Sequence, residues 1–247
     1  MHTGVNVEDL GRLSYAAAYE IQQQRHAEVV ESRAKSPQNI GTILLVEHDP
    51  VVTVTRRPDA ASHITASAEL LESQGVEVAE TDRGGDVTYH GPGQLVVYPI
   101  VDLNLMNCRI VEYLRVLEEI VIETLARFGI RGERDEGATG VWVRAGDQSA
   151  KVCAMGVRVK RWVTMHGLAI NIDPDLAHFG LIVPCGLHGR AVTSMNALLG
   201  DRCPPMDEVK QTLAEIASEK FVDLAATAAK KRAEAQSTES KPGGSQR

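Results

Sequence analysis

The sequence of 247 residues has no long apolar run, few aromatic residues and no excess of basic charge. No stretch approaches the roughly 18 consecutive apolar residues that a membrane-spanning helix needs. Lysine and arginine total 26 against 33 acidic residues, a formal net charge of −7, which argues against a general nucleic-acid binder. The first ten residues, MHTGVNVEDL, show neither a signal-peptide nor a transit-peptide pattern. We therefore expect a soluble cytoplasmic protein without nucleic-acid or membrane partners.

Cysteine is also scarce. The four cysteines, Cys108, Cys153, Cys185 and Cys203, show no CxxC or other zinc-binding spacing. A chain of this length buries about 70% of its unfolded surface, so it needs no disulfide or metal to fold. We therefore expect reduced thiols, one of which could be a nucleophile.

Hydrophobic periodicity predicts three helices. Ser14 can cap a helix over about residues 15–34. Residues 109–128 repeat apolar side chains every three or four positions, and Gly129 can end that helix. A last helix is expected over about residues 207–231.

Short apolar or β-rich stretches predict the strands. They lie at residues 42–48, which residues 51–54 can continue, and at 86–90, 94–103, 141–144, 152–160 and 162–171. The last three follow one another without intervening helices and suggest a meander. This pattern favours an α+β fold with a mixed or mostly antiparallel sheet and flanking helices over a doubly wound fold.

The composition changes near Ala225, beyond which large apolar side chains become rare. Such a segment cannot repay the entropy lost on ordering. We therefore expect one domain over residues 1–224 and a disordered tail over residues 225–247, helical at most at its start.

The stretch RGGDVTYHGPGQ, residues 83–94, is the most unusual in composition, with four glycines in twelve residues. Glycine lets a backbone approach a ligand closely. The stretch matches neither a Walker loop nor a dinucleotide fingerprint. Composition alone leaves two interpretations open, a substrate-cradling loop and two tight turns around a strand.

Three further motifs carry candidate reactive side chains. Lys151 opens the run KVCAMG, His166 opens HGLAIN, and Cys185 stands between proline and glycine in PCG. Cys153 is expected on the same face of its strand as Lys151. Spacing alone does not decide whether Cys153 or Cys185 is a nucleophile. An exposed strand-end lysine and a core histidine are the ordinary alternatives.

In this order, the four motifs resemble the lipoyl(octanoyl) transferase family, over roughly residues 40–196. The resemblance extends to LLVEHDP upstream and AVTSM downstream. It implies a monomer with a fold similar to the catalytic domains of lipoate and biotin protein ligases. It also implies a step of lipoate biosynthesis, in which an octanoyl group passes from octanoyl-acyl carrier protein to a lysine of a lipoyl domain. The acceptors would be 2-oxoacid dehydrogenase complexes and the H protein of the glycine cleavage system.

The resemblance also assigns roles to individual residues. It places the nucleophile at Cys185 and the assisting lysine at Lys151. It implies that the acyl chain and its carbonyl group are held by three segments: Arg83, Gly84, Gly85, Asp86, Val87, Thr88, Tyr89 and His90; Ala154, Met155 and Gly156; and Gly167, Leu168 and Ala169. The sequence departs from the family at Thr55, where members often have glycine.

These residues can support a two-step transfer. A lysine ammonium near Cys185 would favour its thiolate, which takes the acyl group from the carrier thioester. Lys151 would then act as base for the acceptor amine. A thioester is exchanged for a thioester and then for an amide, so neither ATP nor a metal is required. Val87, Met155 and Leu168 are expected to line part of an apolar slot for the chain.

Two other functions use the same fold. An ATP-dependent lipoate or biotin ligase needs a lysine resembling Lys151 but no nucleophilic cysteine, so the PCG motif favours the transferase. A non-catalytic module that binds carrier protein is the alternative from another class. The presence of both Cys185 and Lys151 argues against it.

Overall fold

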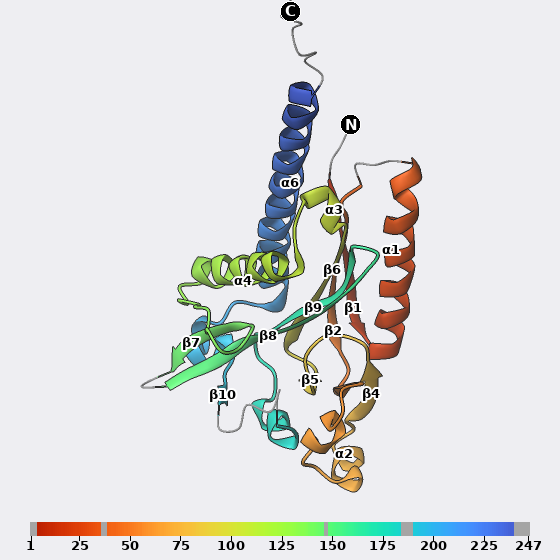
Figure 1. Ribbon diagram of the computed structural model, residues 1–247. Coiled ribbons are helices and arrows are strands. Elements are labelled where there is room, and N and C mark those ends of the chain that lie inside the picture. Colours follow the sequence, from red (N-terminus) through yellow and green to blue (C-terminus); the bar gives the residue numbers. More distant parts are fainter. Residues whose placement is uncertain (1–3, 36–38, 146–147, 184–189, 240–247) are drawn as a thin grey trace, which may run out of the picture.

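The computed structural model describes residues 4–35, 39–145, 148–183 and 190–239, and the strands in these ranges form two sheets (Figure 1). The larger sheet has the order β1 (Val5–Leu13), β2 (Gly41–His48), β6 (Gln94–Val101), β9 (Val163–Asn171), β8 (Gln148–Lys160) and β10 (Ala191–Val192), and β7 (Val141–Ala145) also pairs with β8. The smaller sheet has the order β4 (Glu77–Thr81), β3 (Val51–Thr55) and β5 (Thr88–His90). Both sheets contain parallel and antiparallel neighbours, which confirms the expected mixed α+β architecture.

Helices cover both faces of the larger sheet. One face packs against α1 (Tyr15–Lys35) and the other against α4 (Ile110–Arg127) and α6 (Met206–Glu239), as Figure 1 shows. Side chains alternate along a strand, so Ile43 of β2 packs on the α4 side and Leu44 on the α1 side. Burial on both faces explains the unbroken apolar run of this strand. Shorter elements connect the rest: η1 (Ala60–His63), α2 (Ala68–Ser73), α3 (Leu103–Met106), η2 (Leu176–Leu181), α5 (Met195–Leu199) and η4 (Gly200–Arg202).

Local signals in the sequence set the ends of the long helices. The Ser14 hydroxyl accepts a hydrogen bond from the Ala17 amide at 3.3 Å, which confirms the expected cap. Gly129 follows α4 with a φ of 78°, a conformation that favours glycine. The expected meander is confirmed as the antiparallel strands β7, β8 and β9.

Four of the described strands differ from the sequence-based expectation: β3 belongs to the other sheet, and β1, β4 and β10 are not predicted. Residues 51–54 do not continue β2, because the chain turns at Asp49-Pro50 and enters the smaller sheet as β3. Residues 5–13 form β1, which we do not predict. This strand lies at the sheet edge, parallel to β2, and its sequence VNVEDLGRL has too few apolar residues to give a clear signal.

The carboxy-terminal segment is helical as far as Glu239, and residues 240–247 lie outside the described ranges. Alanine, lysine, arginine and glutamate in this segment are strong helix formers. The guanidinium of Arg232 also links α6 to α3, because it donates to the carbonyls of Asn104 at 3.2 Å and Leu105 at 2.7 Å. Helix propensity and this contact order residues 225–239 despite their lack of large apolar side chains.

Candidate active site

The stretch of residues 83–94, called the glycine-rich loop below, meets β8 and β9 around a cavity of about 450 Å³. This volume lies within the roughly 300–1,000 Å³ typical of small-molecule sites. Most of the residues singled out in the sequence line it: Arg83, Gly84, Gly85, Thr88, His90, Lys151, Ala154, Met155, Gly156, His166, Gly167, Leu168 and Ala169. The fold thus brings three of the four motifs to one cavity.

Of the predicted site residues 83–90, three lie away from this cavity. Val87 and Tyr89 are buried in a separate apolar cluster beneath the smaller sheet. The carboxylate of Asp86 lies 2.6 Å from Nδ1 of His63. Because side chains alternate along a strand, Thr88 and His90 face the cavity while their neighbours face away. The structure therefore places Val87 outside the expected apolar slot.

Other cavity residues carry little signal in the sequence. They are Tyr15, Val96, Tyr98, Ile110, Leu114, Gly137, Ala138, Thr139 and Val157. The apolar side chains among them look like ordinary core residues until the fold is known. The run GATG, residues 137–140, is the exception, because its glycines and small side chains permit close approach of a ligand or another strand.

Glycine is required where the glycine-rich loop packs against the paired strands β8 and β9. The Gly84 amide donates to the Val157 carbonyl at 2.9 Å. A Cβ atom at Gly156 would lie 2.6 Å from the Gly84 carbonyl oxygen, and one at Gly167 would lie 2.2 Å from the Val97 carbonyl oxygen. These glycines let the loop, β8, β9 and β6 approach closely enough to form one cavity wall.

Arg83 is held by hydrogen bonds to a side chain and to the backbone around it. Its guanidinium donates to the hydroxyl of Thr53 at 3.0 Å and to the carbonyl of Asp86 at 2.9 Å. The position of its charge at the cavity wall is therefore set by the protein itself.

A buried chain of polar groups begins at His90. Nδ1 of His90 lies 2.6 Å from Oε1 of Gln94, whose amide nitrogen donates to Oδ1 of Asn171 at 2.9 Å. Asn171 in turn donates to the Thr193 carbonyl at 3.0 Å. Burial, with a smaller contribution from nearby His48, lowers the pKa of His90 to about 3. His90 is therefore neutral at physiological pH.

His166 is paired with an acidic residue. Its Nε2 lies 2.8 Å from Oδ1 of Asp82, whose Oδ2 accepts hydrogen bonds from Tyr19 and Arg158. Burial acts to raise the pKa of Asp82, but these contacts outweigh it and lower the pKa. Burial lowers the pKa of His166 although the carboxylate opposes this. Of this Asp–His pair, His166 lines the cavity.

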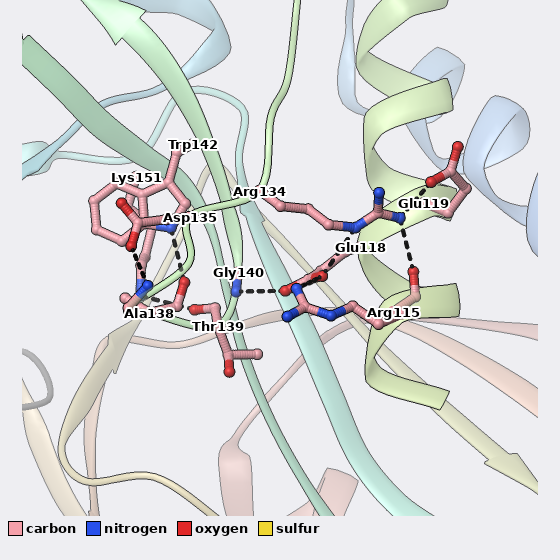
Figure 2. A network of polar contacts seen from close by, with 11 residues as sticks. Arg115, Glu118, Glu119, Arg134, Asp135, Ala138, Thr139, Gly140, Trp142 and Lys151 are labelled. Carbon is pink, nitrogen blue, oxygen red and sulfur yellow. Dashed lines mark hydrogen bonds and ion pairs between the residues drawn. The ribbon is translucent and has the colours of Figure 1, made fainter. Parts of the chain in front are cut away.

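Lys151 lies at another wall, beside the loop that precedes β7. Its Nζ donates to the Thr139 carbonyl at 3.1 Å and lies 4.7 Å from the ring centre of Trp142 (Figure 2). Lys151 also pairs in register with Val192 of β10, and its carbonyl accepts from the Thr193 amide at 2.9 Å. The chain that follows the PCG motif thus returns beside this lysine.

The described thiols are poor nucleophiles. Cys153 is fully buried, which raises its pKa to about 12, and burial raises the pKa of Cys108 to about 11. Burial also raises the pKa of Cys203. Cys153 lies in the core and not in the cavity with Lys151, because the β7–β8 ladder has an irregularity at this point. Cys185 lies outside the described residues.

Thr55 is accommodated without glycine. It ends β3, has no positive φ and donates from its hydroxyl to the Gly85 carbonyl at 3.3 Å. The departure from the family pattern therefore joins β3 to the glycine-rich loop.

The described part of the chain contains neither a metal-binding group of side chains nor a membrane-spanning helix. Its His, Cys, Asp and Glu side chains form no group of three or more that could bind a metal ion. None of its helices has the length and apolarity to cross a bilayer.

Comparison with known proteins decides the family. The model of the lipoyl protein ligase A/B catalytic domain matches residues 14–217. The chain belongs to this family. An octanoyltransferase of Chloroflexus aggregans is 48% identical over 85% of this chain and 91% of its own length. An octanoyltransferase of Flavobacterium psychrophilum is 43% identical over 86% and 94%. The expectation of an octanoyltransferase, an acyltransferase of lipoate biosynthesis, is confirmed.

A solved structure shows the same fold at much lower identity. The bi-partite lipoate protein ligase of Thermoplasma acidophilum, from an archaeal lipoylation system, aligns with a TM-score of 0.63. It is 16% identical, and the alignment covers 92% of each chain. The expected lipoate ligase-like fold is confirmed.

Proposed function

We propose that this family member moves an octanoyl group from octanoyl-acyl carrier protein to a lysine of a lipoyl domain, through a thioester on Cys185. The observation that carries the proposal is the position of Lys151 at the wall of a cavity of about 450 Å³. The same cavity gathers the glycine-rich loop and the two β-strand motifs. An acyl chain and a proton-transferring amine would thus occupy one site.

The cavity suits an alkyl chain with a polar head. Val96, Leu114, Met155 and Leu168 supply apolar lining. Arg83 and Lys151 supply positive charge at the wall, where a tetrahedral oxyanion would be stabilised. The glycine-rich loop would hold the carbonyl end of the chain.

The proposed first step is a thioester exchange. The Cys185 thiolate attacks the carbonyl carbon of the carrier-bound octanoyl group, and the carrier's thiolate leaves with a proton. Lys151, as an ammonium, stabilises the attacking thiolate and supplies that proton. Lys151 is then neutral and able to accept a proton.

The second step forms the amide. The acceptor lysine of the lipoyl domain attacks the Cys185 thioester, its proton passes to Lys151, and the Cys185 thiolate is expelled. The histidines are less suited to this task. The pKa of His90, about 3, makes it a weak base, and Nε2 of His166 is engaged by Asp82.

The remaining features of the proposal follow from composition and from the family resemblance. Residues 1–224 act as one catalytic domain, monomeric and cytoplasmic, which residues 225–239 extend as the last turns of α6. The acceptors are lipoyl domains of 2-oxoacid dehydrogenase complexes and the H protein of the glycine cleavage system. Asp86, Val87 and Tyr89 support the substrate loop from its far side.

The mass of the intact protein after mixing with octanoyl-acyl carrier protein, without ATP, tests the proposal. We expect a gain of one octanoyl group that hydroxylamine removes and that a lipoyl domain accepts. Cys185→Ala should abolish the gain, whereas Cys153→Ala, a matched control, should retain it. An adduct that persists in Cys185→Ala would place the nucleophile elsewhere. Transfer that requires octanoate and ATP would indicate a ligase.

A further inference from the structure

A network of polar contacts fixes the loop of residues 134–140, between α4 and β7 (Figure 2). Its centre is Glu118 of α4, whose side chain is 1% exposed. One carboxylate oxygen accepts from the Gly140 amide at 3.3 Å. The other accepts from Arg115 at 2.7 Å and Arg134 at 3.2 Å. A buried carboxylate held by two arginines is strongly localised, so the end of the loop is anchored to α4.

The other end of the loop is held by Asp135. Its carboxylate pairs with the guanidinium of Arg190 and accepts from the Gly137 amide at 2.9 Å. Arg190 is the first described residue after the PCG motif. The loop is therefore clamped at both ends, by Glu118 and by Asp135.

The clamped loop presents one carbonyl group to Trp142 and one to Lys151. The Ala138 carbonyl accepts from the indole Nε1 of Trp142 at 3.1 Å, and the Thr139 carbonyl accepts from Nζ of Lys151 at 3.1 Å. The close fit depends on Gly140, because a Cβ atom there would lie 2.5 Å from the Cys153 carbonyl oxygen. The indole and the ammonium are thus oriented by neighbouring peptide groups.

Two cationic groups lie close to the ring of Trp142. Nζ of Lys151 lies 4.7 Å from the ring centre, and the guanidinium carbon of Arg190 lies 3.7 Å from it. Both distances are within the range of cation–π attraction. Trp142 is buried and is not among the residues that line the cavity. Any effect of its side chain on the reaction must therefore pass through a neighbour.

We propose that Trp142 is a positioning residue for Lys151, which rests on the proposed role of Lys151 in proton transfer. A lysine side chain has four flexible bonds, so holding it in one orientation costs rotamer entropy. The ring and the Thr139 carbonyl limit the positions of the ammonium before substrate binds. Glu118 and the Asp135–Arg190 pair keep that carbonyl and the ring in place.

The test compares three variants in β7. Trp142→Leu removes the aromatic ring, and Trp142→Phe supplies a smaller aromatic ring without the indole N–H. Val143→Ala, a matched control, perturbs a buried neighbour in the same strand that faces the α4 core. For each variant we would measure kcat, KM for both substrates and the thermal midpoint. The rate at which acetic anhydride labels Lys151, relative to exposed Lys230, provides a readout that needs no turnover.

For Trp142→Leu we expect kcat to fall about tenfold, with KM for either substrate changed less than about twofold. Labelling of Lys151 should become faster. Trp142→Phe should restore most of kcat and the slow labelling, and Val143→Ala should lower the thermal midpoint alone. Equal kcat and labelling in Trp142→Leu and the parent would overturn the proposal. So would the same changes in Val143→Ala, since they would reflect lost stability.

A Lys151→Met variant separates this inference from the proposed function. If it transfers octanoyl as fast as the parent, Lys151 is not the proton carrier. The labelling experiment still decides whether Trp142 positions the lysine.

Discussion

The His90 imidazole donates its Nδ1 proton to Oε1 of Gln94, at 2.6 Å. The direction is fixed because the Gln94 amide nitrogen donates to the Tyr89 carbonyl and to Asn171, which leaves Oε1 as the acceptor. A neutral His90 therefore keeps Nε2 unprotonated. A second proton would have to enter a buried site without a carboxylate partner among these groups.

Acid should destabilise the protein through this histidine. An unfolded chain takes up a proton near pH 6.5, whereas folded His90 stays neutral down to about pH 3. Acid therefore favours unfolding, by about 1.4 kcal/mol per pH unit between roughly pH 6 and pH 4 for this one group. His48 and His166, whose pKa values are also lowered mainly by burial, act in the same direction.

Urea unfolding at pH 7, 6 and 5 would measure this dependence. In His90→Gln the slope of unfolding free energy against pH should fall by about one proton equivalent. Thr124→Val, at a buried residue that does not titrate, should leave the slope unchanged. An identical slope in His90→Gln and the parent would contradict the assignment.

Gly167→Ala should destabilise the fold strongly. The added Cβ would lie 2.2 Å from the Val97 carbonyl oxygen, and backbone in the middle of a sheet cannot move away cheaply. We expect a loss of at least about 2 kcal/mol in the free energy of unfolding. Gly180→Ala is the control, because a Cβ there meets nothing within 4 Å. Similar denaturation midpoints for the two variants would refute the close approach of β6 and β9.

Gly156→Ala should act on substrate binding more than on the fold. Its Cβ would lie 2.6 Å from the Gly84 carbonyl oxygen, so the glycine-rich loop must shift away from β8. We expect KM for octanoyl-acyl carrier protein to rise about tenfold with kcat nearly unchanged, because uniform binding is lost. Steady-state kinetics at saturating lipoyl domain provide the measurement. A fall in kcat at constant KM would instead place the loop in the chemical step.

Arg232→Ala should weaken the attachment of α6 to α3. Its guanidinium donates to the carbonyls of Asn104 and Leu105 at 3.2 and 2.7 Å. We expect a loss of about 1 kcal/mol in unfolding free energy and little change in kcat. The control is Lys231→Ala, at the exposed neighbouring position. An Arg232→Ala variant as stable as Lys231→Ala would show that this end of α6 does not contribute to stability.

Local patterns in the sequence predict much of the fold. The periodicity of residues 109–128 and the glycine after them specify α4, since both signals act within a few residues. The meander of β7, β8 and β9 follows from short polar joints between β-rich stretches. Residues 225–239 show the limit of composition, because helix propensity orders a segment whose few large apolar side chains suggest disorder.

The candidate site likewise depends partly on local sequence patterns and partly on contacts between distant segments. The order of its motifs in the sequence indicates the family and puts Lys151, the glycine-rich loop and residues 154–156 and 167–169 forward as candidates. Contacts between residues far apart in the chain decide the rest. Val87 and Tyr89 face away from the cavity because of strand alternation, and Cys153 is excluded from it by an irregularity in the β7–β8 ladder.

The sequence by itself therefore determined the three long helices, most of the strands, the family and most of the residues around the cavity, since each depends on neighbours along the chain. Tertiary structure decided the neutral state of His90, the close approach of Gly156 to Gly84, and the clamped loop that holds Lys151 beside Trp142. These properties depend on burial and on backbone groups brought together from distant segments. Desolvation and steric contact arise only when those segments pack.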